Sequence, residues 1–254
     1  MHSEERYKEI EEQLLADTET YENSHPNGEL GQTLLTTAEV LSRVQQKAHR
    51  TCHDEVDERH QYQDIFFSKG VNSLFALFRL LKHHHYDAAY REVRFLFETY
   101  LVIRGLNKDQ DKAAQILKRQ KEEIQNLDSD MGQVERGIYE YESVDELHDI
   151  LAGEKSKLKK MDPKYGKIYN YLSNRSSHPV RIEGAMLDGD RSAVEETQLL
   201  KWGIILAFGL AQQFLMTYYE TSAKDLIISK TEPIIKHIEK TIPEGVPTFL
   251  TDSY

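Results

Sequence analysis

The chain has 254 residues, of which 39% are hydrophobic and 30% are charged, and its formal net charge is −11. This composition excludes a disordered chain, and the acidic balance excludes a protein that binds nucleic acid through its overall field. Any contact with nucleic acid must therefore come from a local basic patch. The single cysteine, Cys52, excludes an internal disulfide framework and a thiolate metal cluster.

The segments that could direct the chain to a membrane are weak. Residues 1–14 are charged and lack the apolar region of a signal peptide. The most apolar run, residues 202–211, is far shorter than the ~20 residues that span a bilayer. A lone cysteine suits a reducing compartment, so we expect a cytoplasmic protein with no membrane contact.

The first half of the chain predicts long helices. Residues 1–28 are expected to form a charged helix followed by a turn. A long helix is predicted from residue 30 to about 60, and two more over 64–81 and 86–107, separated by the corner at residues 83–85. The core face of the long helix follows from helical spacing: Leu34, Ala38, Leu41, Val44, Ala48 and Cys52.

The middle of the chain, residues 108–162, is charged and is interpreted as a solvated insertion or hairpin. Asp109 is expected to cap a helix that runs to about residue 126. Ser143 and Glu146 have the spacing of a capping box, which predicts a second helix starting there and ending near residue 160.

The last third contributes an aromatic helix over residues 164–175, a strongly apolar helix over 192–222 and a final helix over 223–242. Together these patterns predict an all-α fold, a helical bundle with a charged helical insertion in the middle. We expect residues 29–242 to form one domain and residues 243–254 to be a tail.

One charged stripe interrupts the apolar helix over residues 86–107. Asp87, Arg91, Arg94 and Glu98 fall within an arc of about 60° at 100° per residue. Two interpretations stay open. The stripe is either the solvent-facing side of the helix, with ion pairs worth a few tenths of a kcal/mol, or a polar patch that lines a cleft.

A second polar segment follows the aromatic helix and ends in a His-Pro pair. An extended histidine before proline could act as a general acid or base, and an arginine beside it could hold a phosphate. The alternative is a polar helix end in which the histidine bonds to backbone. The candidate residues are Tyr171, Ser173, Asn174, Arg175 and His178.

These two segments together resemble a known family. The run Arg91-Glu92-Val93-Arg94-Phe95-Leu96-Phe97-Glu98, followed by Tyr171-Leu172-Ser173 and His178-Pro179, resembles a prokaryotic helical family of unknown function. That family is similar to the HEPN domains (higher eukaryotes and prokaryotes nucleotide-binding) of abortive-infection and toxin–antitoxin systems. The resemblance covers roughly residues 60–220.

The resemblance implies a helical bundle that is often dimeric, and in active members a metal-independent ribonuclease without a cofactor. RNA, and a protein partner such as an antitoxin, are the partners it implies, with a homo-oligomer as the assembly. In that family the catalytic arginine and histidine lie further apart than Arg175 and His178 do here. Arg91 or Arg94 would then supply a cation, His178 the acid and base, and Glu98 the orientation of the arginine. Tyr171, Ser173 and Asn174 would bind substrate.

Two other functions are compatible with the sequence. The charged stripe could be the surface of a non-catalytic interaction or dimerisation module. Alternatively, His49, His53, Asp57 and His60 would share one face of a continuous helix and could bind a metal ion, since imidazole and carboxylate at this spacing are common ligands.

Overall fold

The computed structural model describes residues 28–52, 54–55, 57–126, 142–161, 163–177 and 191–242. The predicted all-α fold is confirmed, because this part of the chain contains eight helices and no strand. The helices are α2 (Gly28–Thr51), α3 (Glu58–Lys82), α4 (Tyr86–Lys108), α5 (Gln110–Gln125), α7 (Glu142–Met161), α8 (Pro163–Ser177), α9 (Arg191–Thr217) and α10 (Lys224–Thr241). The predicted N-terminal helix before Gly28 and the tail from residue 243 lie outside the described residues.

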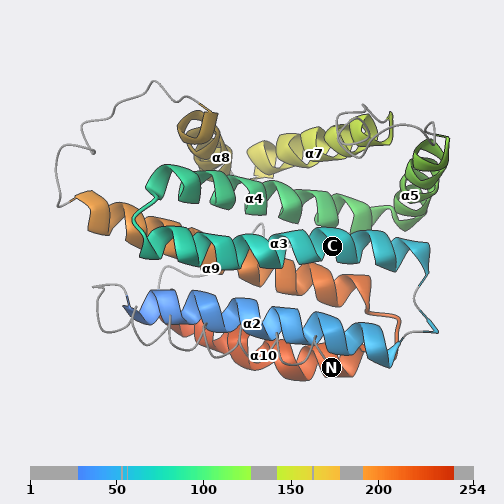
Figure 1. The fold of residues 1–254 in the computed structure, drawn as a ribbon, viewed down its shortest axis with the longest axis horizontal. Helices are drawn as coiled ribbons and strands as arrows, with labels where there is room; N and C mark the ends of the chain where they lie inside the picture. Colours follow the sequence, from blue (N-terminus) through green and yellow to red (C-terminus); the bar gives the residue numbers. More distant parts are fainter. Residues whose placement is uncertain are drawn as a thin grey trace.

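The helices form a layered bundle (Figure 1). Helices α2 and α10 lie side by side at the bottom of the view, α3 and α9 form the middle, and α4 lies above them. Helices α7 and α8 cover the upper side of α4, and α5 stands at the end of the bundle beside α7. Helix α4 is therefore covered from below by α3 and α9 and from above by α7 and α8.

The main core joins α2, α3, α4, α9 and α10. It is built from aromatic and aliphatic side chains that are almost fully buried, such as Phe67, Phe97 and Phe214. Phe67 and Phe214 stack with ring centroids 4.1 Å apart, which joins α3 to α9. Burying this much apolar surface is what holds helices of modest intrinsic propensity together.

Helix α9 contains the one described segment, Val194–Thr217, that is long and apolar enough to cross a membrane. However, 72% of its most apolar window is buried inside the bundle. Burial of this kind is typical of the core helix of a soluble protein.

The predicted long helix from residue 30 to about 60 is wrong at its second half. Helix α2 ends at Thr51, and α3 begins at Glu58. The polar second half offers no apolar face that would hold it as a helix against the core. Instead, the connecting turn is fastened to another turn, because the Glu55 carboxylate accepts a hydrogen bond of 2.7 Å from the backbone N–H of Ser222.

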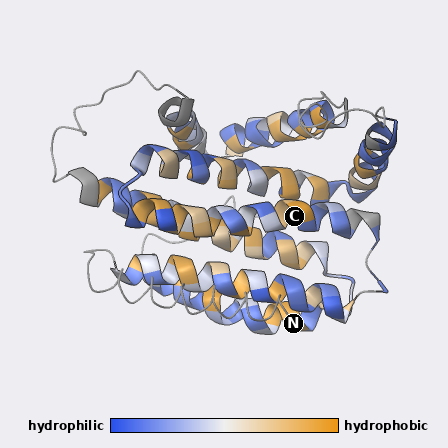
Figure 2. Ribbon diagram, viewed as in Figure 1, coloured by the Kyte–Doolittle hydropathy of each residue, from blue (hydrophilic) through white to orange (hydrophobic). Residues whose placement is uncertain are grey.

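The charged middle of the chain has a small core of its own. Helices α5 and α7 pack against α3 and α4 through Tyr62, Val102, Leu106, Ala113, Ile116 and Leu117. In Figure 2, hydrophilic and hydrophobic residues alternate along α5 and α7, as expected for helices with one buried face. Asp109 caps α5, since its carboxylate accepts the N–H of Lys112 at 3.0 Å.

The predicted capping box at the start of α7 is not the contact that forms there. Ser143 lies inside α7 and donates both its N–H and its hydroxyl to the carboxylate of Glu123 on α5, at 3.1 Å and 2.7 Å. Glu146 pairs with Arg119 of α5 instead. The tertiary partner wins because the carboxylate of Glu123 can accept both donors of Ser143 at once.

Candidate functional site

The charged stripe on α4 divides into an exposed half and a covered half. Asp87 and Arg91 are exposed, and the Arg91 Nε lies 3.5 Å from the backbone oxygen of Asp87 rather than against its carboxylate. Arg94 and Glu98 are half-buried, and the Arg94 Nε lies 3.2 Å from Glu98 Oε1. The solvent-facing interpretation therefore fits the first pair, and the lining of a cleft fits the second.

Three helices meet at Glu98. Its Oε1 accepts a hydrogen bond of 2.5 Å from the Tyr169 hydroxyl on α8, and Lys155 Nζ on α7 lies 3.5 Å from the same oxygen. The Lys155 ammonium also sits 4.3 Å from the centre of the Tyr169 ring, a cation–π contact. We call Arg94, Glu98, Lys155 and Tyr169 the Glu98 cluster.

The protonation of this cluster follows from its burial and its charges. Burial, and then the hydrogen bond to Glu98, raise the pKa of Tyr169 to about 12, so the phenol stays a donor near neutral pH. Burial acts to lower the pKa of Arg94, but the charges of Glu98 and Tyr169 outweigh it and leave that pKa above its ordinary value. The arginine therefore stays a fixed cation next to a fixed carboxylate.

A second cluster lies further along the same two helices. Glu154 of α7 is 3% exposed, and its Oε2 lies 2.9 Å from Lys108 Nζ and 3.5 Å from Arg104 Nε. Its Oε1 lies 2.8 Å from Lys157 Nζ. Burial acts to raise the pKa of Glu154, but Lys157 and Lys108 outweigh it and lower that pKa, so the carboxylate is ionised. We call these four residues the Glu154 cluster.

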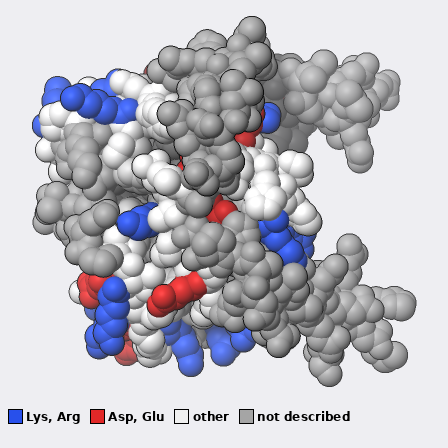
Figure 3. Space-filling view, turned by 90° about the vertical axis from the view of Figure 1, so that its left-hand side faces the viewer, with Lys and Arg blue, Asp and Glu red and all other residues white. Residues whose placement is uncertain are grey.

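The two clusters together form a basic seam between α4 and α7. In their ion pairs, five cationic side chains meet only two carboxylates: Arg94, Arg104, Lys108, Lys155 and Lys157 against Glu98 and Glu154. At 1.5 Å per residue, the seam extends about 21 Å along α4 between Arg94 and Lys108. On the end of the molecule shown in Figure 3, basic and acidic side chains of the described residues are intermixed. The seam is thus a local cation excess on an acidic chain.

The end of α8 places the other candidate residues. Tyr171 is 44% exposed, and its ring meets that of Tyr90 on α4 edge to face, with centroids 5.9 Å apart. Ser173 is half-buried on α8, and the backbones of Asn174 and Arg175 continue the helix. His178 lies outside the described residues, so its predicted approach to Arg94 and Glu98 stays a prediction.

The histidine-rich segment does not form one helical face, because the chain turns between α2 and α3. His49 Nδ1 of α2 lies 3.6 Å from Asp64 Oδ2 of α3, whereas His60 Nδ1 lies 2.8 Å from Asp57 Oδ1. His53 is outside the described residues. Within the described ranges, no group of three or more His, Cys, Asp and Glu side chains could hold a metal ion.

Sequence reasoning found one half of the site and missed the other. Arg94 and Glu98 are four residues apart on one helix, and this spacing predicts their contact. Tyr169 looked like one apolar residue of an aromatic helix, and Lys155 like part of a basic helix end. Comparison of the chain with protein-family models, curated proteins and solved structures gives no match.

Proposed function

We propose that the chain is a metal-independent ribonuclease that binds RNA along the basic seam and cleaves it at the Glu98 cluster. The observation that carries this proposal is the convergence of Arg94, Lys155, Glu98 and Tyr169 from three helices at one end of a local cation excess. The resemblance to the HEPN-like family supports the same function, and adds a prokaryotic defence or stress system and a homodimer as its setting.

The charge of the seam favours a polyanion as ligand. Most of the surface of this acidic chain repels RNA, so binding needs a strip where cations outnumber carboxylates. Lys157 is exposed and Lys108 is half-buried, so both ammonium groups can reach phosphates from the rim of the seam. The seam is about 21 Å long, enough for several phosphates of a single strand.

Exposed aromatic side chains near the seam suit single-stranded RNA in particular. The Tyr171 ring leans on Tyr90 and leaves part of its surface open, and Phe95, beside Arg94 on α4, is 43% exposed. Bases of a single strand stack on such rings at about 1–3 kcal/mol per base. A duplex cannot present its bases in this way.

The proposed cleavage needs one base and one cation. The ribose 2′-hydroxyl attacks the neighbouring phosphorus, the P–O5′ bond breaks, and His178 accepts the hydroxyl proton. Water supplies the proton that the leaving O5′ takes up. Arg94 and Lys155 stabilise the charge that develops on the phosphorane, and Glu98 with Tyr169 holds the Arg94 guanidinium in place. Arg175 and Arg91 are the other arginines available for the same role.

The test is cleavage of an end-labelled single-stranded RNA by the full chain in the presence of EDTA. We expect cleavage to persist in the chelator, and His178→Ala and Arg94→Ala each to slow it by about 100-fold or more. The matched controls are His83→Ala, an exposed histidine of the α3–α4 corner, and Lys236→Ala, an exposed lysine of α10. Both controls should cleave at the wild-type rate.

Binding measured by fluorescence anisotropy at several salt concentrations separates binding from chemistry. Arg94→Ala should weaken RNA binding and reduce the slope of log K against log salt by about 0.7 per lost contact. Unchanged cleavage in His178→Ala would overturn the mechanism. A purified chain that neither binds nor cleaves RNA would overturn the proposal as a whole.

A second candidate is a non-catalytic interaction module that uses the same surface. The observation that favours it is the exposure of Phe95 and Tyr171, since aromatic side chains at a surface are typical of the centre of protein interfaces. A stable homodimer that dissociates in Phe95→Asp, together with an absence of RNA cleavage, would favour this candidate over the ribonuclease.

A further inference from the structure

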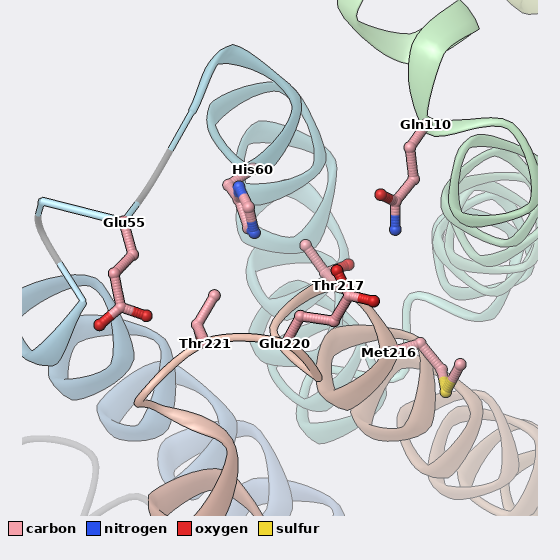
Figure 4. Close-up of a pocket in the computed structure, with 7 residues that line it drawn as sticks. All are labelled: Glu55, His60, Gln110, Met216, Thr217, Glu220 and Thr221. Carbon is pink, nitrogen blue, oxygen red and sulfur yellow. The ribbon is translucent and has the colours of Figure 1, made fainter.

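A cavity of about 230 Å³ lies at the end of the bundle, away from the Glu98 cluster (Figure 4). It opens where the turn between α2 and α3 meets the turn between α9 and α10. His60 and Thr217 are buried and form its floor. Glu55 borders it on one side, and Glu220 and Gln110 lie across from Glu55.

The groups that line this cavity mainly accept hydrogen bonds. The 2.8 Å contact of His60 Nδ1 with Asp57 Oδ1 requires a proton on Nδ1, so the Nε2 of the neutral ring is an acceptor. Hydrogen bonds from Ser222 lower the pKa of Glu55, which therefore stays a carboxylate. The Thr217 hydroxyl already donates within the bundle, to Asn107 Oδ1 or to the backbone oxygen of Gln213.

The charge of the lining is negative and is not balanced locally by its own members. Two lining residues are carboxylates, and none of the described lining residues is Lys or Arg. A concave site lined by one sign of charge concentrates ions of the opposite sign. The cavity therefore selects a cation.

The spacing of the lining groups argues against a metal ion as this cation. Among the described residues, no three His, Cys, Asp or Glu side chains are close enough to hold one. A molecule that spans the cavity can reach Glu55, His60 and Glu220 without requiring them to converge. Met216 supplies an apolar wall that suits a short carbon chain.

We propose that this cavity binds a small aliphatic amine, with its ammonium groups at the carboxylates of Glu55 and Glu220 and its carbon chain against Met216. The volume equals that of about seven or eight water molecules, which matches a diamine of the size of putrescine. This site is independent of the proposed ribonuclease site, and either can fail without the other.

The experiment is calorimetric titration of the full chain with putrescine. We expect saturable binding that weakens as salt is raised, and no binding of butanol, which has the same carbon chain without the charges. Glu55→Gln and Glu220→Gln should each weaken binding by about fivefold, as an exposed ion pair allows. The matched control is Glu232→Gln, an exposed carboxylate of α10 that pairs with Lys236 and should leave the affinity unchanged.

Both target glutamates are exposed, so their variants should fold, and a thermal melt of each variant checks this. Absence of saturable putrescine binding by the wild-type chain would overturn the proposal. So would equal affinity in Glu55→Gln, Glu220→Gln and wild type, or butanol binding as tightly as putrescine.

Discussion

Replacing Glu154 by alanine should destabilise the fold more than removing any surface carboxylate. Glu154 is 3% exposed, and the side chain of its partner Arg104 is 7% exposed, so the substitution leaves a buried guanidinium without its counter-ion. Breaking a buried pair from one side costs about 3–5 kcal/mol, because the remaining charge is neither solvated nor neutralised. Lys108 and Lys157 regain water and add little to this cost.

The assay is urea denaturation followed by circular dichroism, with a thermal melt beside it. A loss of this size lowers the melting temperature by about 10 °C in a chain of this length. The matched control is Glu146→Ala on the same helix, where the side chains of Glu146 and Arg119 are 26% and 49% exposed and the pair contributes at most about 1 kcal/mol. A Glu154→Ala variant as stable as Glu146→Ala would refute the argument.

The pH dependence gives an independent check on Glu154. Its pKa in the folded chain is lowered, so its contribution to stability is fully present above the unfolded value of about 4.3. That contribution is lost as pH falls from there through the folded pKa. Glu154→Gln removes this titration, so its unfolding free energy should fall less than that of the wild type below pH 4.3. Parallel curves would contradict the assignment of the charge.

Three further substitutions test the packing around the seam and the core. A Cβ at Gly105 would collide with Cγ2 of Ile150 on α7, so Gly105→Ala should cost about 1–3 kcal/mol in urea denaturation. At Gly153 a Cβ meets nothing within 4 Å, so Gly153→Ala should stabilise α7 by about 0.5–1 kcal/mol in the same assay. Tyr218→Phe removes the 2.6 Å hydrogen bond to the half-buried carboxylate of Asp64 and should cost about 1–3 kcal/mol in a thermal melt.

The helices that the sequence predicts well are those with a continuous apolar face. The predicted helix over residues 86–107 and the observed α4 differ by one residue, because its apolar periodicity persists to both ends. The end of α2 was wrong because helical spacing alone cannot tell a polar helix from a polar turn. That turn depends on a bond between Glu55 and Ser222, which are 167 residues apart.

The candidate site was predictable only where it is local. The contact of Arg94 with Glu98 follows from their spacing on one helix. Tyr169 and Lys155 lie 71 and 57 residues from Glu98 along the chain, and no periodicity relates them. Their approach is decided by how α7 and α8 cross α4, which depends on packing of the whole bundle.

The charge of the basic seam exceeds what the fold needs. One buried carboxylate requires one counter-ion, and Arg104 fills that role for Glu154 from inside the bundle. Lys108 and Lys157 reach the same carboxylate from more exposed positions, where an ion pair adds little stability but still adds positive field. If that field serves RNA binding, Glu154→Gln must move two quantities in opposite directions. It should lower the unfolding free energy, and it should tighten RNA binding and steepen its salt dependence. A variant that loses both stability and RNA affinity would show that the seam contributes to the fold alone.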